Sequence, residues 1–153
     1  MLRRTGVLMS TANRELVHRW FEEVWNKQSE DAIDQMFASD GKCYGFPGPG
    51  QVLVGPAKFK EVHRSFIGAF PDIHVTVDDM ISQGDKVAVR FSIRGTHHGD
   101  HLGVPATHRE VRFPAMSFVR CRNGQIVEGW NTVDMHGMLQ QIGAAEVKAG
   151  VKG

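Results

Sequence analysis

The hydrophobic periodicity of the chain changes once, near Ile73, and this change limits the possible folds more than any other feature. Before Ile73, outside a short stretch at 42–54, apolar residues recur every three or four positions, which is the period of amphipathic helices. After it, apolar and polar residues alternate, most clearly over 87–94, which is the period of half-buried strands. Helices early and strands late predict an α+β domain whose helices cover one face of a mostly antiparallel sheet.

The helical half predicts three helices. The first begins at an N-cap at Ser10 or Thr11, a short second one ends near 40–41, and the third covers 55–70, with a proline in its first turn. The first helix carries the broadest apolar stripe, formed by Val17, Trp20, Phe21, Val24 and Trp25. Such a stripe is wide enough to cover a sheet.

The second half predicts strands joined by hairpins. The dipeptide Asn123-Gly124 is a strong two-residue hairpin signal, and a short helix at 134–142 closes the chain, with Gly143 as its C-cap. The expected strands of this half cover 74–81, 87–94, 111–122 and 126–133. Two further strands, at 42–46 and a short return strand at 51–54, are expected earlier, before the third helix.

Length and charge set the organisation of the chain. Its 153 residues fit one domain, which we expect at 10–145, between a flexible leader at 1–9 and a flexible tail at 146–153. The net charge of +1, with both signs well mixed, argues against a nucleic-acid or anionic-membrane surface. No apolar run approaches the roughly 18 residues of a membrane helix. We therefore expect a cytoplasmic protein without nucleic-acid or membrane partners.

The two cysteines, Cys43 and Cys121, lie far apart in the sequence. They show no metal-binding spacing, and we interpret them as small buried hydrophobic residues. A disulfide between them stays an alternative, although nothing else in the sequence indicates secretion.

Three segments resemble the SnoaL-like polyketide and ester cyclases of the nuclear-transport-factor-2-like superfamily. Residues 95–107 read G-T-H-H-G-D-H-L-G-V-P-A-T, residues 120–130 read R-C-R-N-G-Q-I-V-E-G-W, and residues 134–143 read D-M-H-G-M-L-Q-Q-I-G. These resemble the family patterns G-T-H-x-G-x-x-x-G-x-P-x-T, R-x-x-x-G-x-I-x-E-x-W and D-x-x-x-x-L-x-Q-L-G, with Ile142 at the second leucine position of the last pattern. The resemblance implies a cone-shaped, curved, mixed but mostly antiparallel sheet, wrapped by helices around an apolar pocket.

The chemistry implied by the resemblance is acid–base catalysis without a cofactor on a small hydrophobic carbonyl, ester or polyketide-like substrate. In the cyclases the second pattern usually continues as E-H-W-D, and its aspartate looks like the proton-transfer residue. This chain has Gly129 and Asn131 at the histidine and aspartate positions. An amide can bind an oxyanion or orient a water, but it does not exchange a proton at neutral pH. An enzyme, a non-catalytic small-molecule binder and a dimerisation scaffold all stay open.

Four residues are the catalytic candidates: Asn131, Asp134, His97 and Arg90. Asp134 lies at a strand-to-helix junction, so it is either a site carboxylate or an N-cap. His97 matches the family loop and is expected to order it by hydrogen bonding. Arg90 and Ser92 share a strand face at two positions that, in epoxide-hydrolase relatives, an arginine and an aspartate of the hydrolytic site look to hold, so here serine replaces the aspartate. The alternative for Arg90 is a surface or cross-strand ion pair.

The ligand and the partners follow from the same resemblance. Four histidines within 97–108 lack the spacing of a zinc site, so we predict neither a metal nor a cofactor. We expect a pocket of roughly 300–1,000 Å³ and, because relatives pair through the outer face of the sheet, a homodimer or higher homo-oligomer. His63 is either a hydrogen-bonded core-edge residue or a pocket base. The predicted ligand-binding residues are Trp20, Tyr44, Phe46, His63, Phe70, Ser92, Met116 and Phe118.

Overall fold

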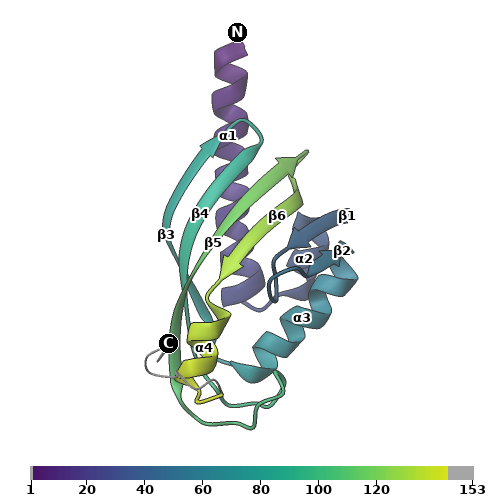
Figure 1. Cartoon of the computed structure of the whole chain (residues 1–153). Coiled ribbons are helices and arrows are strands. Elements are labelled where there is room, and N and C mark those ends of the chain that lie inside the picture. Colours follow the sequence, from purple (N-terminus) through teal and green to yellow (C-terminus); the bar gives the residue numbers. More distant parts are fainter. Residues whose placement is uncertain (1, 145–153) are drawn as a thin grey trace, which may run out of the picture.

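A six-stranded mixed sheet forms the centre of the structure, a computed structural model that describes residues 2–144 (Figure 1). The strand order is β2-β1-β6-β5-β4-β3, with β1 parallel to β6 and every other pair antiparallel. The sheet curves but does not close, because β2 and β3 form its two edges. The strands are β1 Phe37–Tyr44, β2 Val52–Val54, β3 His74–Gln83, β4 Lys86–Thr96, β5 Glu110–Arg122 and β6 Gln125–Val133. The predicted α+β fold with a curved, mostly antiparallel sheet is confirmed.

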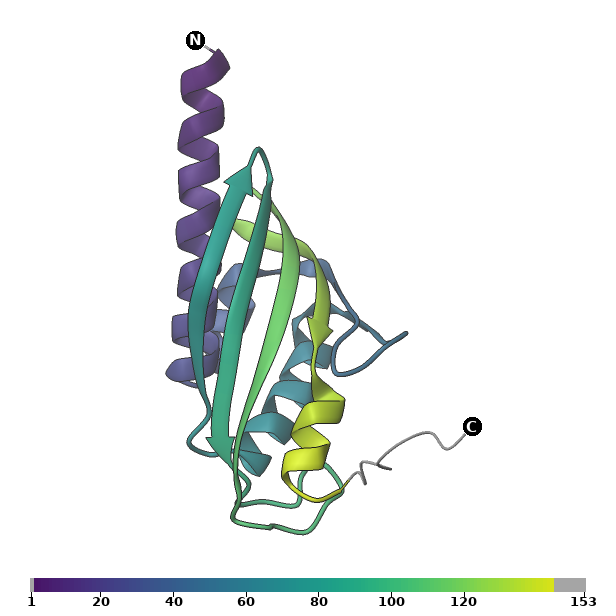
Figure 2. The ribbon, with the colours of Figure 1, turned by 60° about the vertical axis from the view of Figure 1, so that its left-hand side comes forward.

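Helices pack against one face of this sheet, here called the inner face. The first helix, α1 Leu2–Arg19, continues into the π-helical segment η1 Trp20–Asn26, and both contact β3. Helix α3 Gly55–Ala69 contacts β1, and Figure 2 shows α1 and α3 beside different parts of the curved sheet. Two short helices, α2 Glu30–Met36 and α4 Met135–Gln141, complete the described chain. No described helix combines the length and the apolar character that a membrane span needs.

Alternation along the strands separates the inner face from the opposite, outer face. In β5, Val111, Phe113 and Ala115 are buried, whereas the residues between them are exposed. The same alternation in β4 buries Val87 and Val89. This is the pattern of an antiparallel sheet with one covered side. The inner residues, together with η1 and α3, form the hydrophobic core.

Two elements begin well before their predicted first residues. Helix α1 begins at Leu2 rather than at Ser10 or Thr11, and in Figure 1 its first turns project beyond the β3–β4 hairpin. The Ser10 hydroxyl is hydrogen-bonded to that of Ser82 in β3 over 2.6 Å, so Ser10 fastens the helix to the hairpin instead of capping it. Strand β1 begins at Phe37 rather than at Lys42, because Phe37 pairs with Ile126 in β6. Phe37 also fits the apolar spacing of the preceding helix, but its pairing with β6 places it in a strand.

Both cysteines are buried free thiols, as the sequence predicted. Residues 2–9, expected as a leader, lie within α1. The expected tail at 146–153 lies outside the described residues.

Candidate ligand-binding site

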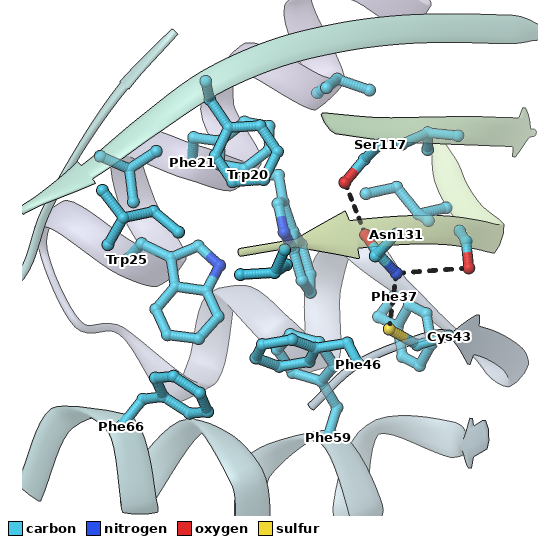
Figure 3. A pocket seen from close by; sticks show the side chains of 18 of the residues that line it. Trp20, Phe21, Trp25, Phe37, Cys43, Phe46, Phe59, Phe66, Ser117 and Asn131 are labelled. Atoms are coloured by element: carbon cyan, nitrogen blue, oxygen red, sulfur yellow. Dashed lines mark hydrogen bonds between the residues drawn. The ribbon is translucent and has the colours of Figure 1, made fainter. Parts of the chain in front are cut away.

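An apolar cavity of about 80 Å³ lies between the inner face, η1 and α3 (Figure 3). Its volume is well below the predicted range of roughly 300–1,000 Å³, because aromatic rings from four elements and the β1–β2 loop fill the space. Trp20 and Phe59 meet edge to face with ring centroids 5.1 Å apart, and Phe46 and Phe66 lie 5.2 Å apart. The aromatic lining consists of Trp20, Phe21, Trp25, Phe37, Phe46, Phe59, Phe66 and Phe91.

One cluster of polar side chains faces this cavity. Asn131 in β6 is the cross-strand partner of Ser117 in β5, and both side chains point to the inner face. The Ser117 hydroxyl donates to Asn131 Oδ1 over 2.6 Å. Asn131 Nδ2 donates to the carbonyl oxygen of Tyr44 over 2.9 Å and to Cys43 Sγ over 3.2 Å. A carbonyl oxygen on one side and a hydroxyl on the other fix the amide orientation, because only the nitrogen can donate to Tyr44.

A glycine allows β1 to reach this cluster. Gly45 follows β1 with a φ of 75°, a conformation in which a side chain is strained. A Cβ at this position would lie 2.3 Å from the backbone oxygen of Asn131, so only glycine permits the approach. The approach brings the Tyr44 carbonyl within hydrogen-bonding distance of the Asn131 amide.

Gly129 leaves open space beside the same amide. It lines the cavity, and the only atom within 4 Å of a Cβ built on it is Asn131 Nδ2, at 3.8 Å. A contact of this length is ordinary van der Waals packing. The absence of a side chain at position 129 therefore adds free volume next to the polar cluster.

The cavity has no group that is charged at neutral pH. Burial raises the pKa of the Cys43 thiol to about 12, against a smaller opposing effect of the hydrogen bond from Asn131. The thiol is thus protonated under physiological conditions. Among the cavity-lining residues of the described chain there is no carboxylate, imidazole, lysine or arginine. Side-chain acid–base catalysis of the kind implied by the resemblance has no titrating group here.

His63 lies behind the cavity wall rather than in it. Its side chain is 2% exposed, and Nε2 donates to the carbonyl of Val24 in η1 over 2.7 Å. Its ring lies 5.0 Å from that of Trp25, which separates it from the cavity. Burial lowers the pKa of His63, and the hydrogen bond to Val24 only partly offsets this effect. His63 is therefore a neutral residue that satisfies a carbonyl near the end of η1, and it does not line the cavity.

His97 orders the connection between β4 and β5. It is fully buried, its Nδ1 accepts from the backbone N–H of Thr107 over 3.2 Å, and its ring packs on Phe70 with centroids 5.7 Å apart. Neither His97 nor Phe70 lines the cavity. The hydrogen bonding expected from the family loop is present.

Four predicted site residues on β4 and β5 face outwards. Arg90, Ser92, Met116 and Phe118 lie on the outer face, because they are in the opposite phase of the alternation from the buried residues of their strands. The Ser92 hydroxyl donates to Asp78 in β3. None of the four lines the inner cavity.

Tyr44 also faces outwards, stacked on Trp130 with ring centroids 5.8 Å apart and planes 12° apart. Large apolar side chains gather on this face: Ile81, Met116, Phe118 and Trp130 are 69%, 58%, 47% and 40% exposed. They line a shallow groove of about 480 Å³. The outer face therefore carries its own apolar surface, separate from the inner cavity.

Asp134 caps α4. Its carboxylate accepts from the backbone N–H of Gly137 over 2.9 Å, which is the N-cap alternative weighed from the sequence. Of the predicted site residues, the structure brings Trp20, Phe46 and Asn131 together at the cavity. Sequence reasoning missed Ser117 and Cys43. Ser117 had a usable signal, because it is a polar residue in the buried phase of an otherwise apolar β5.

The histidine-rich connection brings two rings together. Nδ1 of His98 lies 3.1 Å from Nδ1 of His108. Over residues 2–144, no three or more His, Cys, Asp or Glu side chains are grouped as a metal site requires.

A curved, mostly antiparallel sheet covered by helices on one face defines the α+β fold class of this chain. The sequence profile of the SnoaL-like polyketide cyclases matches residues 15–142, so the chain belongs to this family. Among curated protein sequences, none matches the chain.

Solved structures share the fold. A candidate SnoaL-like polyketide cyclase from Jannaschia sp. CCS1 is 24% identical, with a TM-score of 0.80 over 90% of this chain and 96% of that one. TsrD from Streptomyces laurentii is 22% identical, with a TM-score of 0.76 over 88% and 97%. IdmH from Streptomyces antibioticus, a candidate polyketide cyclase, is 29% identical, with a TM-score of 0.75 over 86% and 98%. The first two show the fold alone.

Proposed function

We propose that this chain encloses a small hydrophobic, polyketide-like molecule in the inner cavity and has a cyclase-type role there without a cofactor. The observation that carries the proposal is the Ser117–Asn131 pair, a single polar cluster in an otherwise apolar cavity. Ligand sites of this kind combine apolar walls with a few polar groups that fix orientation. Membership of the SnoaL-like polyketide cyclase family supports the same role.

Orientation is the contribution that these residues can make. Holding two reacting groups of one molecule together can be equivalent to an effective concentration of about 10⁵–10⁸ M, and a ring closure depends on such proximity. The apolar walls would fold the substrate and exclude water. Asn131 would hold one polar atom of the substrate in place, while the Cys43 thiol, whose pKa is about 12, keeps its proton.

Binding requires the aromatic rings to move. An engineered apolar cavity of about 150 Å³ accommodates benzene, and the cavity here is about half that size. Phe46 is the lining ring best placed to move, because it lies in the loop between β1 and β2, next to Gly45 and close to Gly48 and Gly50. We propose that displacement of Phe46 admits the ligand.

A second candidate is binding without catalysis. It is favoured by the lack of any carboxylate or imidazole among the cavity-lining residues of the described chain. The cavity, the polar cluster and the entry route are the same in both candidates, so only turnover separates them.

One experiment tests both candidates. A linear aromatic β-keto ester that carries one hydroxyl group would be incubated with the protein, binding would be followed by calorimetry, and cyclised product by mass spectrometry. Saturable binding with product above the buffer rate supports the cyclase-type role, whereas binding without product supports the binder. If neither binding nor product is found, both ligand functions fail and a scaffold function is left.

We also propose that two copies pair through the outer face. Exposed apolar surface in a contiguous patch typically marks an interaction site, and Ile81, Met116, Phe118 and Trp130 form one here. A homodimer would cover these side chains and leave the inner cavity free.

The compartment is part of the same proposal. Cys43 and Cys121 are both free thiols, and free thiols are typical of reducing compartments. We propose the cytoplasm, as the sequence suggested.

A further inference from the structure

We infer that the ligand is a neutral molecule carrying one hydroxyl or N–H group, which it donates to Asn131 Oδ1 or Ser117 Oγ. This inference rests on the proposed function, because it assumes that the inner cavity binds a small molecule. It follows from counting the hydrogen-bond donors and acceptors that the polar cluster has left to offer.

The donors of the cluster are already in use. Both hydrogens of the Asn131 amide are engaged, because Nδ2 lies 2.9 Å from the Tyr44 carbonyl oxygen, 3.2 Å from Cys43 Sγ and 3.4 Å from the Gly129 carbonyl oxygen. The single Ser117 proton is donated to Asn131 Oδ1 over 2.6 Å. The Cys43 S–H is left, and a thiol is a weak donor.

The acceptors of the cluster are only partly used. Asn131 Oδ1 has two lone pairs and receives one hydrogen bond, from Ser117. Ser117 Oγ donates that bond and keeps its own lone pairs free. A ligand hydroxyl or N–H can join this arrangement without breaking any bond, whereas a ligand carbonyl would have to take the Ser117 proton away from Asn131.

The electrostatics of the cavity select a neutral ligand. Its other lining side chains are aromatic or aliphatic, and no cation faces it from η1, α3, β1 or the inner sheet residues. An ionised carboxylate or enolate moved from water into such surroundings loses its hydration without a counter-charge, which is strongly unfavourable. The ligand class is therefore a mostly apolar alcohol, phenol or N–H compound.

Three small probes of similar shape test the inference: phenol donates and accepts, benzaldehyde only accepts, and toluene does neither. Their dissociation constants would be measured on the full chain by calorimetry. We expect phenol to bind about tenfold more tightly than benzaldehyde, because an acceptor buried against acceptors stays unpaired. Equal affinities, or a preference for benzaldehyde, would overturn the inference and leave the proposed function standing.

The variant Ser117→Ala tests the inference from the protein side, because it removes a hydrogen-bond donor from the cluster. Without the serine hydroxyl, Asn131 Oδ1 loses its only donor, so the preference for phenol over toluene should rise about fivefold. If Ser117 instead donated to the ligand, benzaldehyde would lose affinity in this variant. Ser92→Ala, the same change on the outer face, is the matched control and should leave all three affinities unchanged.

The possible failures are distinguishable. If none of the three probes binds the wild-type chain, the proposed function fails and the inference with it. If Ser117→Ala does not fold, as circular dichroism would show, the wild-type ratio of phenol to benzaldehyde decides alone.

Discussion

Substitution of Gly129 by alanine should make the protein more stable and at the same time weaken its binding site. The added Cβ would meet only Asn131 Nδ2, at 3.8 Å, so it fits without strain. Gly129 is not among the glycines with positive φ, so an L-residue can adopt its backbone conformation. Replacing glycine by alanine at a compatible position stabilises a protein by about 0.4–1 kcal/mol. For a chain of this size that corresponds to a rise in Tm of roughly 1–4 °C.

The effect on binding has the opposite sign. The methyl group would occupy part of a cavity of about 80 Å³, next to the Ser117–Asn131 pair. We expect toluene and phenol to bind at least about tenfold more weakly, a loss of about 1.4 kcal/mol. Thermal unfolding followed by circular dichroism and calorimetric titration measure the two effects on one sample.

The combination of results is what tests the reasoning. A lower Tm would mean that the space beside Gly129 is not open, and unchanged affinity would mean that the ligand does not bind there. Gly124→Ala is a useful contrast, because Gly124 has a φ of 76° in the β5–β6 turn. This variant should lower Tm through backbone strain and leave ligand affinity unchanged.

Three further changes have defined outcomes. Asn131→Asp introduces a carboxyl whose pKa burial should raise, so the Tm of this variant relative to the wild type should fall as pH rises from 4 to 8; a constant difference would contradict this. Burial lowers the pKa of His63 in the folded protein, whereas in the unfolded chain the same side chain has the ordinary histidine pKa of about 6.5. Below that pH the unfolded chain therefore binds more protons, so stability should fall as pH drops from about 7 to 5. His63→Asn keeps a side-chain N–H donor for the Val24 carbonyl but does not titrate, so Tm should depend less on pH between 7 and 5 in this variant. If the pH dependence of Tm were unaltered, a group other than His63 would be responsible for it. Phe118→Glu should convert a dimer to a monomer in light scattering, whereas Arg122→Glu near the end of the same strand should not; a wild-type monomer would exclude the proposed dimer.

The fold could be predicted from the sequence because the period of the apolar residues shows which side of each element is buried. The change of period at Ile73, the Asn123-Gly124 hairpin and the proline at the start of α3 each correspond to an element of the structure. Element boundaries that depend on tertiary contacts could not be predicted from the period of the apolar residues. Phe37 fits the apolar spacing of a helix, and only its pairing with Ile126 shows that it belongs to a strand.

The candidate site was only partly accessible, for two reasons. Apolar character alone predicts Met116 and Phe118 as ligand-binding residues. They alternate along β5 with buried residues such as Phe113, and this alternation places them on the outer face. The same alternation would have identified Ser117 as an inward-facing polar residue. The cavity volume was beyond sequence reasoning, because it depends on how the aromatic rings of η1, α3 and β1 interlock.

The central claim is that small hydrophobic molecules bind the inner cavity beside Asn131. A titration of the isotope-labelled protein with toluene, followed by amide chemical shifts in two-dimensional NMR, tests it most directly, because toluene needs no hydrogen bond. We expect saturable shifts of the Asn131 side-chain amide and of the backbone amides of Ser117 and Gly129. Shifts confined to the outer-face residues Met116 and Trp130, or no saturable shifts at all, would contradict it.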